Sequence, residues 1–158
     1  MAEEAAIQAE LIKKFPFLES KVRVQRARRI YTEVGPEKFA EVFDYAVKNM
    51  HFCILCTITG LDEGQVLSFI YHIAREDGTV LNIKRSVPKE NPVIKTITPY
   101  FFAADIYERE VMDLLGAKVE GLAPGKRYPL PDEWPQDQYP LRKDWKTPSK
   151  GTEAKQNA

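Results

Sequence analysis

The sequence predicts an α+β domain in which helices cover an antiparallel β-meander, followed by an extended, proline-rich C-terminal arm. Three strand-like segments follow one another over residues 52–87, and the connections between them are too short to hold a crossover helix. Helical patterns lie on both sides of these strands, so helices are expected to cover one face of the sheet. Six of the eleven prolines come after Gly116, where they exclude regular helix and central strand.

The first third of the chain predicts a helix, a strand and a second helix. An alanine- and glutamate-rich stretch over residues 2–15 has a helical pattern and ends at Pro16. Valines then alternate with basic residues within residues 21–34, which favours a half-buried strand with a basic outer face. Pro36 suits the first position of a helix that runs to Met50.

The middle of the chain predicts the meander itself. Each apolar stretch is rich in β-branched and aromatic residues and is bounded by a short connection containing Gly and Asp. Strands are expected at residues 52–59, 66–73 and 79–87, separated by tight connections at residues 61–64 and 75–78.

A connector over residues 88–99 leads to the last predicted helix. Thr98 is placed as its N-cap and Pro99 as its first residue, and Gly116 suits a left-handed C-terminal cap. At 100° per residue its apolar side chains form one arc that should pack on the sheet, namely Ala103, Ala104, Tyr107, Val111, Leu114 and Leu115.

These elements divide the chain into a core domain over residues 1–116, an arm over 117–146 and a disordered tail over 147–158. The 23 basic and 23 acidic residues cancel, so no overall charge attracts nucleic acid or an anionic membrane. The longest apolar run, Phe52–Ile58, is far shorter than the roughly 20 residues of a spanning helix. The acidic start of the chain is unlike a signal peptide, and a soluble, cytoplasmic protein is expected.

Cys53 and Cys56 form a C-x-x-C pair, with His51 as a further potential metal ligand. The surrounding residues favour a strand, on which positions three apart point to opposite faces. The two thiols therefore diverge, and two more ligands for a zinc or iron–sulfur site are not evident. Buried, reduced thiols in the core are the preferred interpretation.

The last predicted helix carries a dense cluster of charges. Asp105, Arg109 and Asp113 share one face, so Arg109 can pair with either aspartate. Glu110 lies at the border of the apolar arc and Glu108 near the opposite border, and residues two apart on a helix make a poor acid–base pair. The residues alone favour a solvated face, then a partner-docking face, and last a catalytic one.

Aromatic residues interleave with the prolines of the arm. A flexible linker would be rich in Gly and Ser instead. An arm laid along the surface of a partner, with aromatic anchors, is preferred over an arm that packs back on its own domain. The anchors expected in this role are Tyr128, Trp134, Tyr139 and Trp145.

Two motifs in this order carry a family resemblance. The run Glu108-Arg109-Glu110-x-x-Asp113-Leu-Leu-Gly116, followed by Tyr139-Pro-Leu-Arg-Lys-Asp144, resembles the 30 kDa subunit family of respiratory complex I. That family includes the matching subunits of group 4 membrane-bound NiFe hydrogenases. The resemblance spans most of the chain, from Val34 to Trp145, and includes a connector at residues 87–92.

The resemblance implies a peripheral subunit without a cofactor of its own, on the cytoplasmic side of the cell membrane and held there through its complex. The nickel–iron centre would lie in a large, 49 kDa-like subunit and the 4Fe-4S clusters in a small iron–sulfur subunit, while membrane subunits move ions. This chain would brace the large subunit during hydrogen evolution or oxidation, and it would hold no catalytic residue or metal.

The residues expected at the partner interface come from both motifs and from the segment between them. Arg109→Ala is predicted to weaken assembly without changing the metal content of an isolated large subunit. The expected interface consists of Glu108, Arg109, Glu110, Asp113, Gly116, Arg127, Tyr139, Pro140, Leu141, Arg142, Lys143, Asp144 and Trp145.

The segment between the motifs bears on the branch of the family. Quinone-reducing members usually carry a histidine–proline pair and paired arginines there, whereas residues 121–135 of this chain offer Arg127 and no histidine. The short domain and the stretch 127–135 are more similar to energy-converting hydrogenases, including formate hydrogenlyase and Ech-type complexes. The alternative within the family is a subunit of an NADH:quinone oxidoreductase-like complex.

Two other classes of function remain as alternatives. One is a nucleic-acid-binding module that uses the basic strand from Lys21 to Arg29. The other is a stand-alone enzyme that uses Glu110 or His72, although the apolar neighbours of His72 favour a packed or edge histidine.

Overall fold

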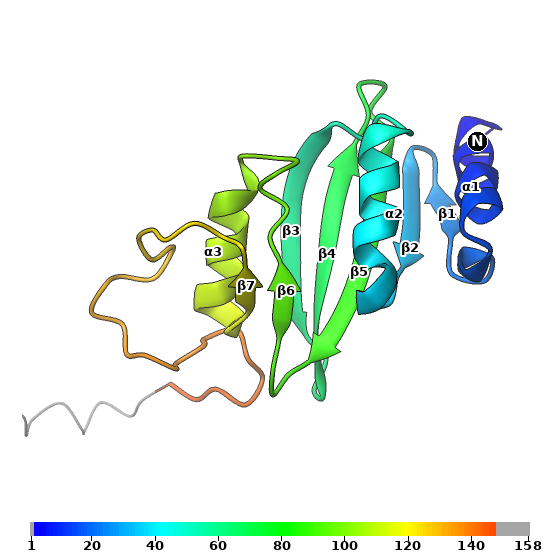
Figure 1. The fold of residues 1–158 in the computed structure, drawn as a ribbon. Helices are drawn as coiled ribbons and strands as arrows, with labels where there is room; N and C mark the ends of the chain where they lie inside the picture. Colours follow the sequence, from blue (N-terminus) through cyan, green and yellow to red (C-terminus); the bar gives the residue numbers. More distant parts are fainter. Residues whose placement is uncertain (1, 148–158) are drawn as a thin grey trace, which may run out of the picture.

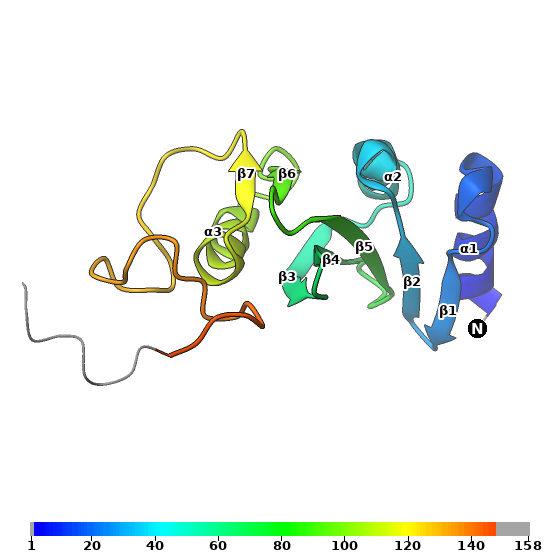
Figure 2. The ribbon, with the colours of Figure 1, turned by 90° about the horizontal axis from the view of Figure 1, so that it is seen from below.

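The main sheet of this computed structural model, which describes residues 2–147, has the strand order β1-β2-β5-β4-β3. Helix α2 (Pro36–Lys48) lies across one face of the sheet, and α1 (Ala2–Lys14) lies beside β1 and β2 at one end (Figures 1 and 2). At the opposite end α3 (Ala104–Leu115) flanks β3, which is the edge strand. The predicted α+β class is confirmed.

The predicted meander forms the centre of the sheet. Strands β3 (Ile54–Asp62), β4 (Val66–Ala74) and β5 (Val80–Pro88) pair antiparallel in sequence order. Gly64 and Gly78 in the two connections have φ values of 94° and 82°, a backbone region that is open to glycine at little steric cost. These turns explain why the meander could be predicted from the sequence.

The N-terminal part of the sheet corrects the prediction. The single strand expected within residues 21–34 is a hairpin of β1 (Arg23–Arg26) and β2 (Arg29–Glu33). Its turn places Arg28 at φ 59°, without the glycine that would have indicated a reversal. Strand β2 then pairs in parallel with β5, because α2 carries the chain across the sheet before the meander begins. The sheet is therefore mixed.

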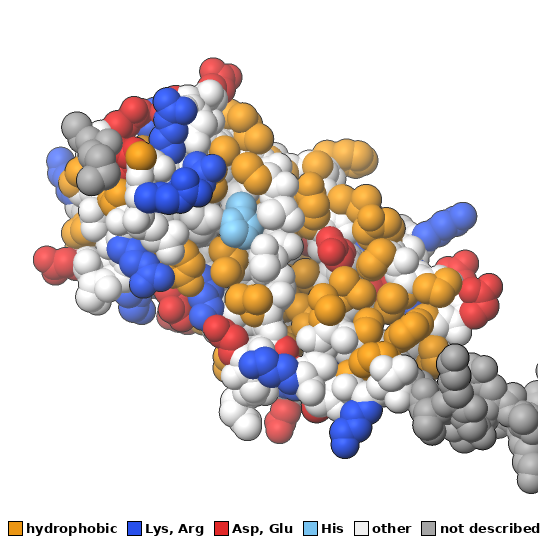
Figure 3. Space-filling view, turned by 180° about the vertical axis from the view of Figure 1, so that it is seen from behind, with side chains coloured by type: hydrophobic (Ala, Val, Ile, Leu, Met, Phe, Trp, Pro, Cys, Tyr) orange, Lys and Arg blue, Asp and Glu red, His pale blue; other side chains and the backbone are white. Residues whose placement is uncertain are grey.

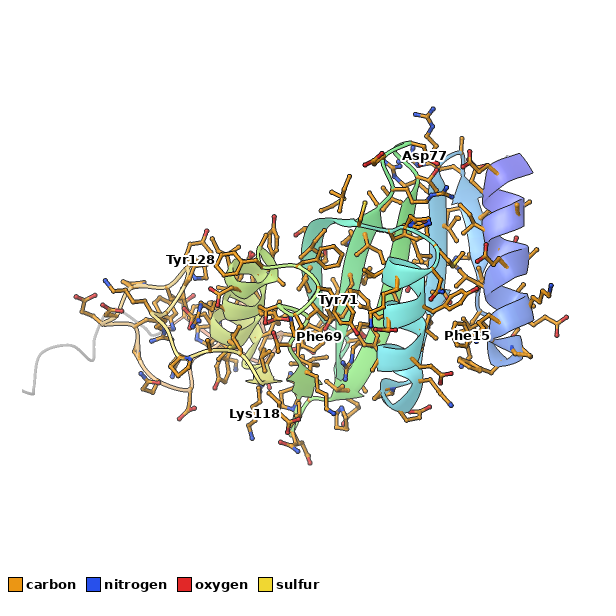
Figure 4. All side chains as sticks on the ribbon, turned by 45° about the horizontal axis from the view of Figure 1, so that its top comes forward. Phe15, Phe69, Tyr71, Asp77, Lys118 and Tyr128 are labelled. Carbon is orange, nitrogen blue, oxygen red and sulfur yellow. The ribbon has the colours of Figure 1, made fainter. Side chains whose placement is uncertain are left out.

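The core lies between the sheet and the helices that cover it. Its central aromatic group joins α2 to β4. Tyr71, labelled with Phe69 in Figure 4, contributes its ring from β4, and this ring lies 4.7 Å from that of Phe39 and 5.7 Å from that of Phe43 on α2. Phe69 and Tyr71 are fully buried, and burial of the Phe69 side chain contributes about 1.5–3 kcal/mol. A charged residue, Arg85, is buried beside this group.

Helix α3 starts later than predicted. Residues 97–103 form turns, in which Tyr100 and Phe101 donate backbone hydrogen bonds to the Ile97 carbonyl, and the helix begins at Ala104. The expected cap at Thr98 is wrong because the aromatic side chains of residues 100 and 101 turn toward Phe43 on α2. The predicted end is confirmed, with Gly116 at φ 75°.

Two short strands lie in segments expected to be irregular. Strand β6 (Val93–Lys95), within the predicted connector, pairs in parallel with β7 (Lys118–Glu120), directly after α3. From residue 121 to residue 147 the chain continues without helix or strand (Figure 1). The tail predicted to be disordered lies, apart from Thr147, outside the described residues.

The expected burial of the two cysteines is wrong. Both Cys53 and Cys56 are exposed free thiols. Cys53 precedes β3, and Cys56 occupies an irregularity in the pairing of β3 with β4. The side of β3 away from β4 has no strand neighbour in the described sheet, and so an apolar run there does not guarantee burial. None of the described helices is long and apolar enough to cross a membrane.

Candidate partner interface

The two motifs meet in space at the C-terminal end of α3. Arg142 donates from Nε to the Leu115 carbonyl at 2.7 Å and lies over the Tyr139 ring at 4.6 Å. The backbone N–H of Leu141 donates to the Leu114 carbonyl at 3.0 Å. The arm therefore packs on its own domain here, which corrects the preference for an arm laid wholly along a partner.

Gly116 makes this contact possible. A Cβ atom at this position would lie 2.6 Å from the Tyr139 ring and 2.8 Å from Arg142 Nη2, distances that real Cβ atoms do not show. The same residue takes the left-handed conformation that ends α3. Both requirements favour glycine. The same residue therefore ends α3 and leaves room for Tyr139 and Arg142 of the arm to pack against it.

Asp62, at the end of β3, forms a second anchor for the arm. Its Oδ2 atom accepts hydrogen bonds from the Lys143 backbone N–H at 2.8 Å and from Lys89 Nζ at 2.7 Å, and Oδ1 accepts one from Gly64. Burial alone would raise the pKa of Asp62, but these hydrogen bonds and the Lys89 charge lower it to about 2. Lys89 also pairs with Asp144 at 3.0 Å.

Sequence reasoning missed both Asp62 and Lys89. Asp62 lies 81 residues before its partner Lys143, and it resembles an ordinary turn residue in the sequence. No local pattern distinguishes Asp62, since its role depends on the position at which the arm packs against the end of β3.

The charge cluster of α3 is divided between two segments of the arm. Arg109 pairs with Asp105 at 2.8 Å and donates to the carbonyls of Ala123 and Lys126. A hydrogen bond from Arg109 lowers the pKa of Asp105. Of the two aspartates expected within its reach, Arg109 pairs with Asp105, whereas Asp113 pairs with another arginine, which belongs to the arm.

That other arginine is Arg127. Its Nε donates to Asp113 Oδ1 at 2.9 Å and its Nη1 to the Trp134 carbonyl at 2.7 Å. The Trp134 and Trp145 rings lie 6.0 Å apart, and both indole N–H groups donate to Gln138, one to its carbonyl and one to its side chain. The arm thus has its own small framework, which Arg127 connects to α3.

Glu108 corrects the expected interface. Its side chain is 0% exposed and its two oxygens accept hydrogen bonds from Thr96 Oγ1 at 2.6 Å and from the Ile97 backbone N–H at 2.7 Å. Burial raises the pKa of Glu108, and the two hydrogen bonds reduce this rise without cancelling it. This glutamate holds the segment after β6 against α3 and has no surface to offer a partner.

Other predicted residues remain accessible. Glu110 and Pro140 are half-buried, Lys143 and Asp144 are exposed, and Leu141 is 56% exposed. Among the described residues the Glu110 carboxylate accepts no hydrogen bond and forms no ion pair.

Two exposed hydrophobic residues extend this surface. Phe102, just before α3, is 91% exposed, and Ile106 is 44% exposed. Ile106 and Glu110 are four residues apart on α3 and so share one side of the helix, and Phe102 lies in the turn that leads into it. We call Phe102, Ile106, Glu110 and Leu141 the α3 stripe. Figure 3 shows hydrophobic side chains gathered on the side of the molecule where α3 and the arm lie, with acidic groups among them.

The groups considered for a stand-alone enzyme do not meet. Both ring nitrogens of His72 are occupied, by Thr59 Oγ1 at 2.9 Å and by Asn82 Oδ1 at 2.6 Å, as expected of a packed histidine. His72 lies on β4 within the main sheet, whereas Glu110 lies on α3. Within residues 2–147 no three His, Cys, Asp or Glu side chains are grouped so as to hold a metal ion.

The part of the chain that contains these contacts matches a known family. The family model described as respiratory-chain NADH dehydrogenase, 30 kDa subunit, matches residues 32–151. The chain belongs to this family. The matched range begins in β2 and includes the meander, α3 and both motifs, so the match to the 30 kDa family covers the two anchors of the arm. The resemblance inferred from the two motifs is confirmed.

Individual members of the 30 kDa family are similar over most of the chain. One subunit of the F420H2 dehydrogenase of Methanosarcina mazei is 33% identical over 135 residues, which cover 84% of this chain and 85% of that protein. The beta subunit of the membrane-bound hydrogenase of Pyrococcus furiosus is 27% identical over 157 residues, or 92% and 88% of the two chains.

A solved structure is similar at the level of the fold. It is that of the membrane-bound sulfane sulfur reductase, an archaeal respiratory membrane complex, and the match has a TM-score of 0.80 at 26% identity. It covers 91% of this chain and 86% of the matched one. These relatives are subunits of redox complexes, and the comparisons give the nucleic-acid alternative no support.

Proposed function

We propose that this chain is a cofactor-free peripheral subunit of a membrane-bound, energy-converting NiFe hydrogenase complex and braces its large catalytic subunit. The observation that carries this proposal is the match to a membrane-bound hydrogenase subunit over 92% of this chain and 88% of that one. Such coverage includes the arm as well as the core. The segment between the two motifs, with Arg127 and no histidine, points to the same branch.

A second candidate within the family is a subunit of a membrane-associated dehydrogenase that contains no nickel. It is favoured by the 33% identity to an F420H2 dehydrogenase subunit. This candidate shares the bracing role and differs in the chemistry of the partner subunits. The NADH:quinone alternative inferred from the sequence stands beside it, since an NADH-quinone oxidoreductase subunit of Moorella thermoacetica is 30% identical over 105 residues.

The bracing role is proposed for the α3 stripe. Large apolar groups such as Phe102 and Ile106 are well suited to the centre of a protein interface, where aromatic residues are enriched. Beside them the carboxylate of Glu110, which has no partner within residues 2–147, can pair with a basic group of the partner. Once such a pair is desolvated, removing one member costs about 3–5 kcal/mol.

The residues of the two motifs serve this interface indirectly. Arg109, Asp113 and Arg127 bind one part of the arm to α3, while Gly116, Tyr139 and Arg142 bind another. Side chains on α3 and on the arm are thereby held in a constant relation, which lowers the entropy lost on docking. Leu141 belongs to the arm and is presented beside α3 in this way.

The partners follow from the same proposal. The large subunit would hold the nickel–iron centre and the small subunit the 4Fe-4S clusters, and membrane subunits would translocate ions. The chain would then lie on the cytoplasmic side of the cell membrane, held there through its partners.

Purification from native membranes tests the proposal. The chain would be tagged and isolated from detergent-solubilised membranes, followed by nickel analysis and mass spectrometry of co-purifying chains. Nickel together with a large hydrogenase subunit is expected. A large subunit without nickel would favour the dehydrogenase candidate, and isolation of the chain without any large subunit would contradict both.

Two matched variants locate the interface. Ile106 and Ile54 are 44% and 45% exposed, but only Ile106 belongs to the α3 stripe. Ile106→Lys is expected to reduce co-purification of the large subunit at least about tenfold, the effect of losing 1.4 kcal/mol of binding. Ile54→Lys should leave it unchanged. Equal recovery from both variants would show that the stripe is not the docking surface.

A further inference from the structure

A cavity lies on the helix-covered side of the sheet. It is bounded by α2, β5 and the segment from β6 to Tyr100. Its volume of about 690 Å³ falls within the range of small-molecule sites, which is roughly 300–1,000 Å³. Most of its walls are apolar, and they include Phe39, Phe43, Ile94, Ile97, Pro99 and Tyr100.

Arg85 lines this cavity as a buried charge that has no carboxylate partner among the described residues. The residue is only 6% exposed, and its Nε atom makes no hydrogen bond within the described chain. No Asp or Glu of residues 2–147 forms an ion pair with its guanidinium. The nearby Tyr71 hydroxyl is buried too. The Arg85 charge acts on it, opposing the rise that burial causes in the pKa of Tyr71, but the hydroxyl makes no hydrogen bond of normal geometry. A buried charge without a counter-ion is costly, so its presence calls for an anion.

Arg85 also stacks on an aromatic ring of the cavity wall. The guanidinium stacks over the Phe39 ring, with Cζ 4.7 Å from the ring centroid. Stacking uses the flat face of the group, while its N–H donors lie in the plane and can bind a carboxylate through two parallel hydrogen bonds.

The remaining charges around the cavity balance one another. Lys48 and Lys95 are basic and Glu37 and Glu120 are acidic, and all four are exposed. Arg85 therefore supplies the one positive charge in excess among the lining residues, and it is the one that is buried. A single positive charge within apolar walls matches a singly charged anion with an apolar body, whereas a phosphate dianion would need further donors.

We propose that this cavity binds a small carboxylate with an aromatic or branched apolar body. The carboxylate would pair with Arg85, and the apolar body would lie against the aromatic side chains of α2 and of residues 97–100. The site involves the chain alone, so its existence does not depend on which complex the chain belongs to.

A titration of the full-length chain tests the site. The probe is 3-phenylpropanoate, compared with its neutral amide, 3-phenylpropanamide, and binding is followed by ¹H–¹⁵N NMR. Saturable shifts are expected at backbone amides that line the cavity. The acid should bind at least about tenfold more tightly than the amide, because only the acid can pair with the arginine.

Two arginine variants identify the group responsible. Arg85→Met keeps the length and the apolar packing of the side chain and should weaken binding of the acid at least about tenfold. Arg23→Met is the matched control, because Arg23 also stacks on an aromatic ring, that of Tyr31, at 4.7 Å, but on an exposed strand. It should leave binding unchanged.

A further variant covers the case in which Arg85→Met does not fold. Ala40 is an exposed residue of α2 that lines the cavity, and Ala40→Phe would fill part of the space without touching the charge. It should also abolish binding. Absence of saturable shifts in the unmodified chain, equal binding of acid and amide, or unchanged binding by a folded Arg85→Met variant would each overturn the proposal.

Discussion

Gly116→Ala offers a direct test of how the arm is held. The substitution has two separate costs. The first is backbone strain, since alanine at φ 75° loses about 1–2 kcal/mol relative to glycine. The second is the displacement of Tyr139 and Arg142, whose side chains occupy the place of the new methyl group.

The second cost follows from the contacts that would be broken. The hydrogen bond from the charged Arg142 to the Leu115 carbonyl contributes about 1.5–3 kcal/mol, and the stacking of Arg142 on Tyr139 about 0.5–1 kcal/mol. Gly116→Ala should therefore cost about 3–6 kcal/mol in all, a large part of the typical stability of a domain.

Gly64→Ala is the matched control. Gly64 also has a positive φ, 94°, but a Cβ atom there would meet no heavy atom within 4 Å. It should lose only the backbone term of about 1–2 kcal/mol. Urea unfolding of the full-length chain, followed by circular dichroism, measures both variants.

The comparison can refute the reasoning. If the two alanine variants lose the same stability within about 0.5 kcal/mol, the arm is not held at Gly116. Combining Gly116→Ala with Tyr139→Ala provides a second check, because removing the ring makes room for the methyl group. A coupling of at least about 1 kcal/mol is expected between the two sites.

Three further predictions follow from the anchors and the surface. The pKa of Asp62 is about 2 in the folded chain and about 3.9 in the unfolded chain. The ionised carboxylate therefore stabilises the fold fully above about pH 4, and this stabilisation is lost as the pH falls to about 2. Asp62→Asn should flatten that part of a plot of urea midpoint against pH. Arg127→Met should speed proteolysis of the arm, mapped by mass spectrometry, whereas Lys126→Met should not. Of these two neighbours, Arg127 binds Asp113 of α3 through its side chain, while Lys126 contributes a backbone carbonyl. The thiols of Cys53 and Cys56 should react with N-ethylmaleimide in the folded chain at rates close to those in urea, since both are exposed; protection of either would contradict the structure.

Local patterns were sufficient for much of the fold. The meander could be predicted because its turns contain Gly and Asp and its strands are apolar stretches of ordinary length. The turn at Arg28 and the parallel pairing of β2 with β5 could not, since the first lacks a glycine and the second joins segments about 50 residues apart. The prediction for the cysteines was wrong for a related reason, because burial on an edge strand depends on what covers it.

The partner-interface residues illustrate the same division. Both motifs, their order and the family could be recognised from the sequence, because these depend only on residue type and spacing. Which residues face outward could not be recognised. Helical phasing placed Glu108 and Glu110 at opposite borders of one arc, and the folded chain buries Glu108 completely while leaving the carboxylate of Glu110 without a partner among the described residues.

Residue type and spacing along the chain thus established the α+β class, the end of α3 at Gly116 and membership of the 30 kDa family. The folded chain added that the charged motifs are contacts between α3 and the arm, that Asp62 anchors the arm from 81 residues away, and that Arg85 is buried beside a cavity without a counter-ion from the described residues. Each of these depends on the approach of distant segments. Such an approach follows from how the whole core packs, and no local pattern encodes it.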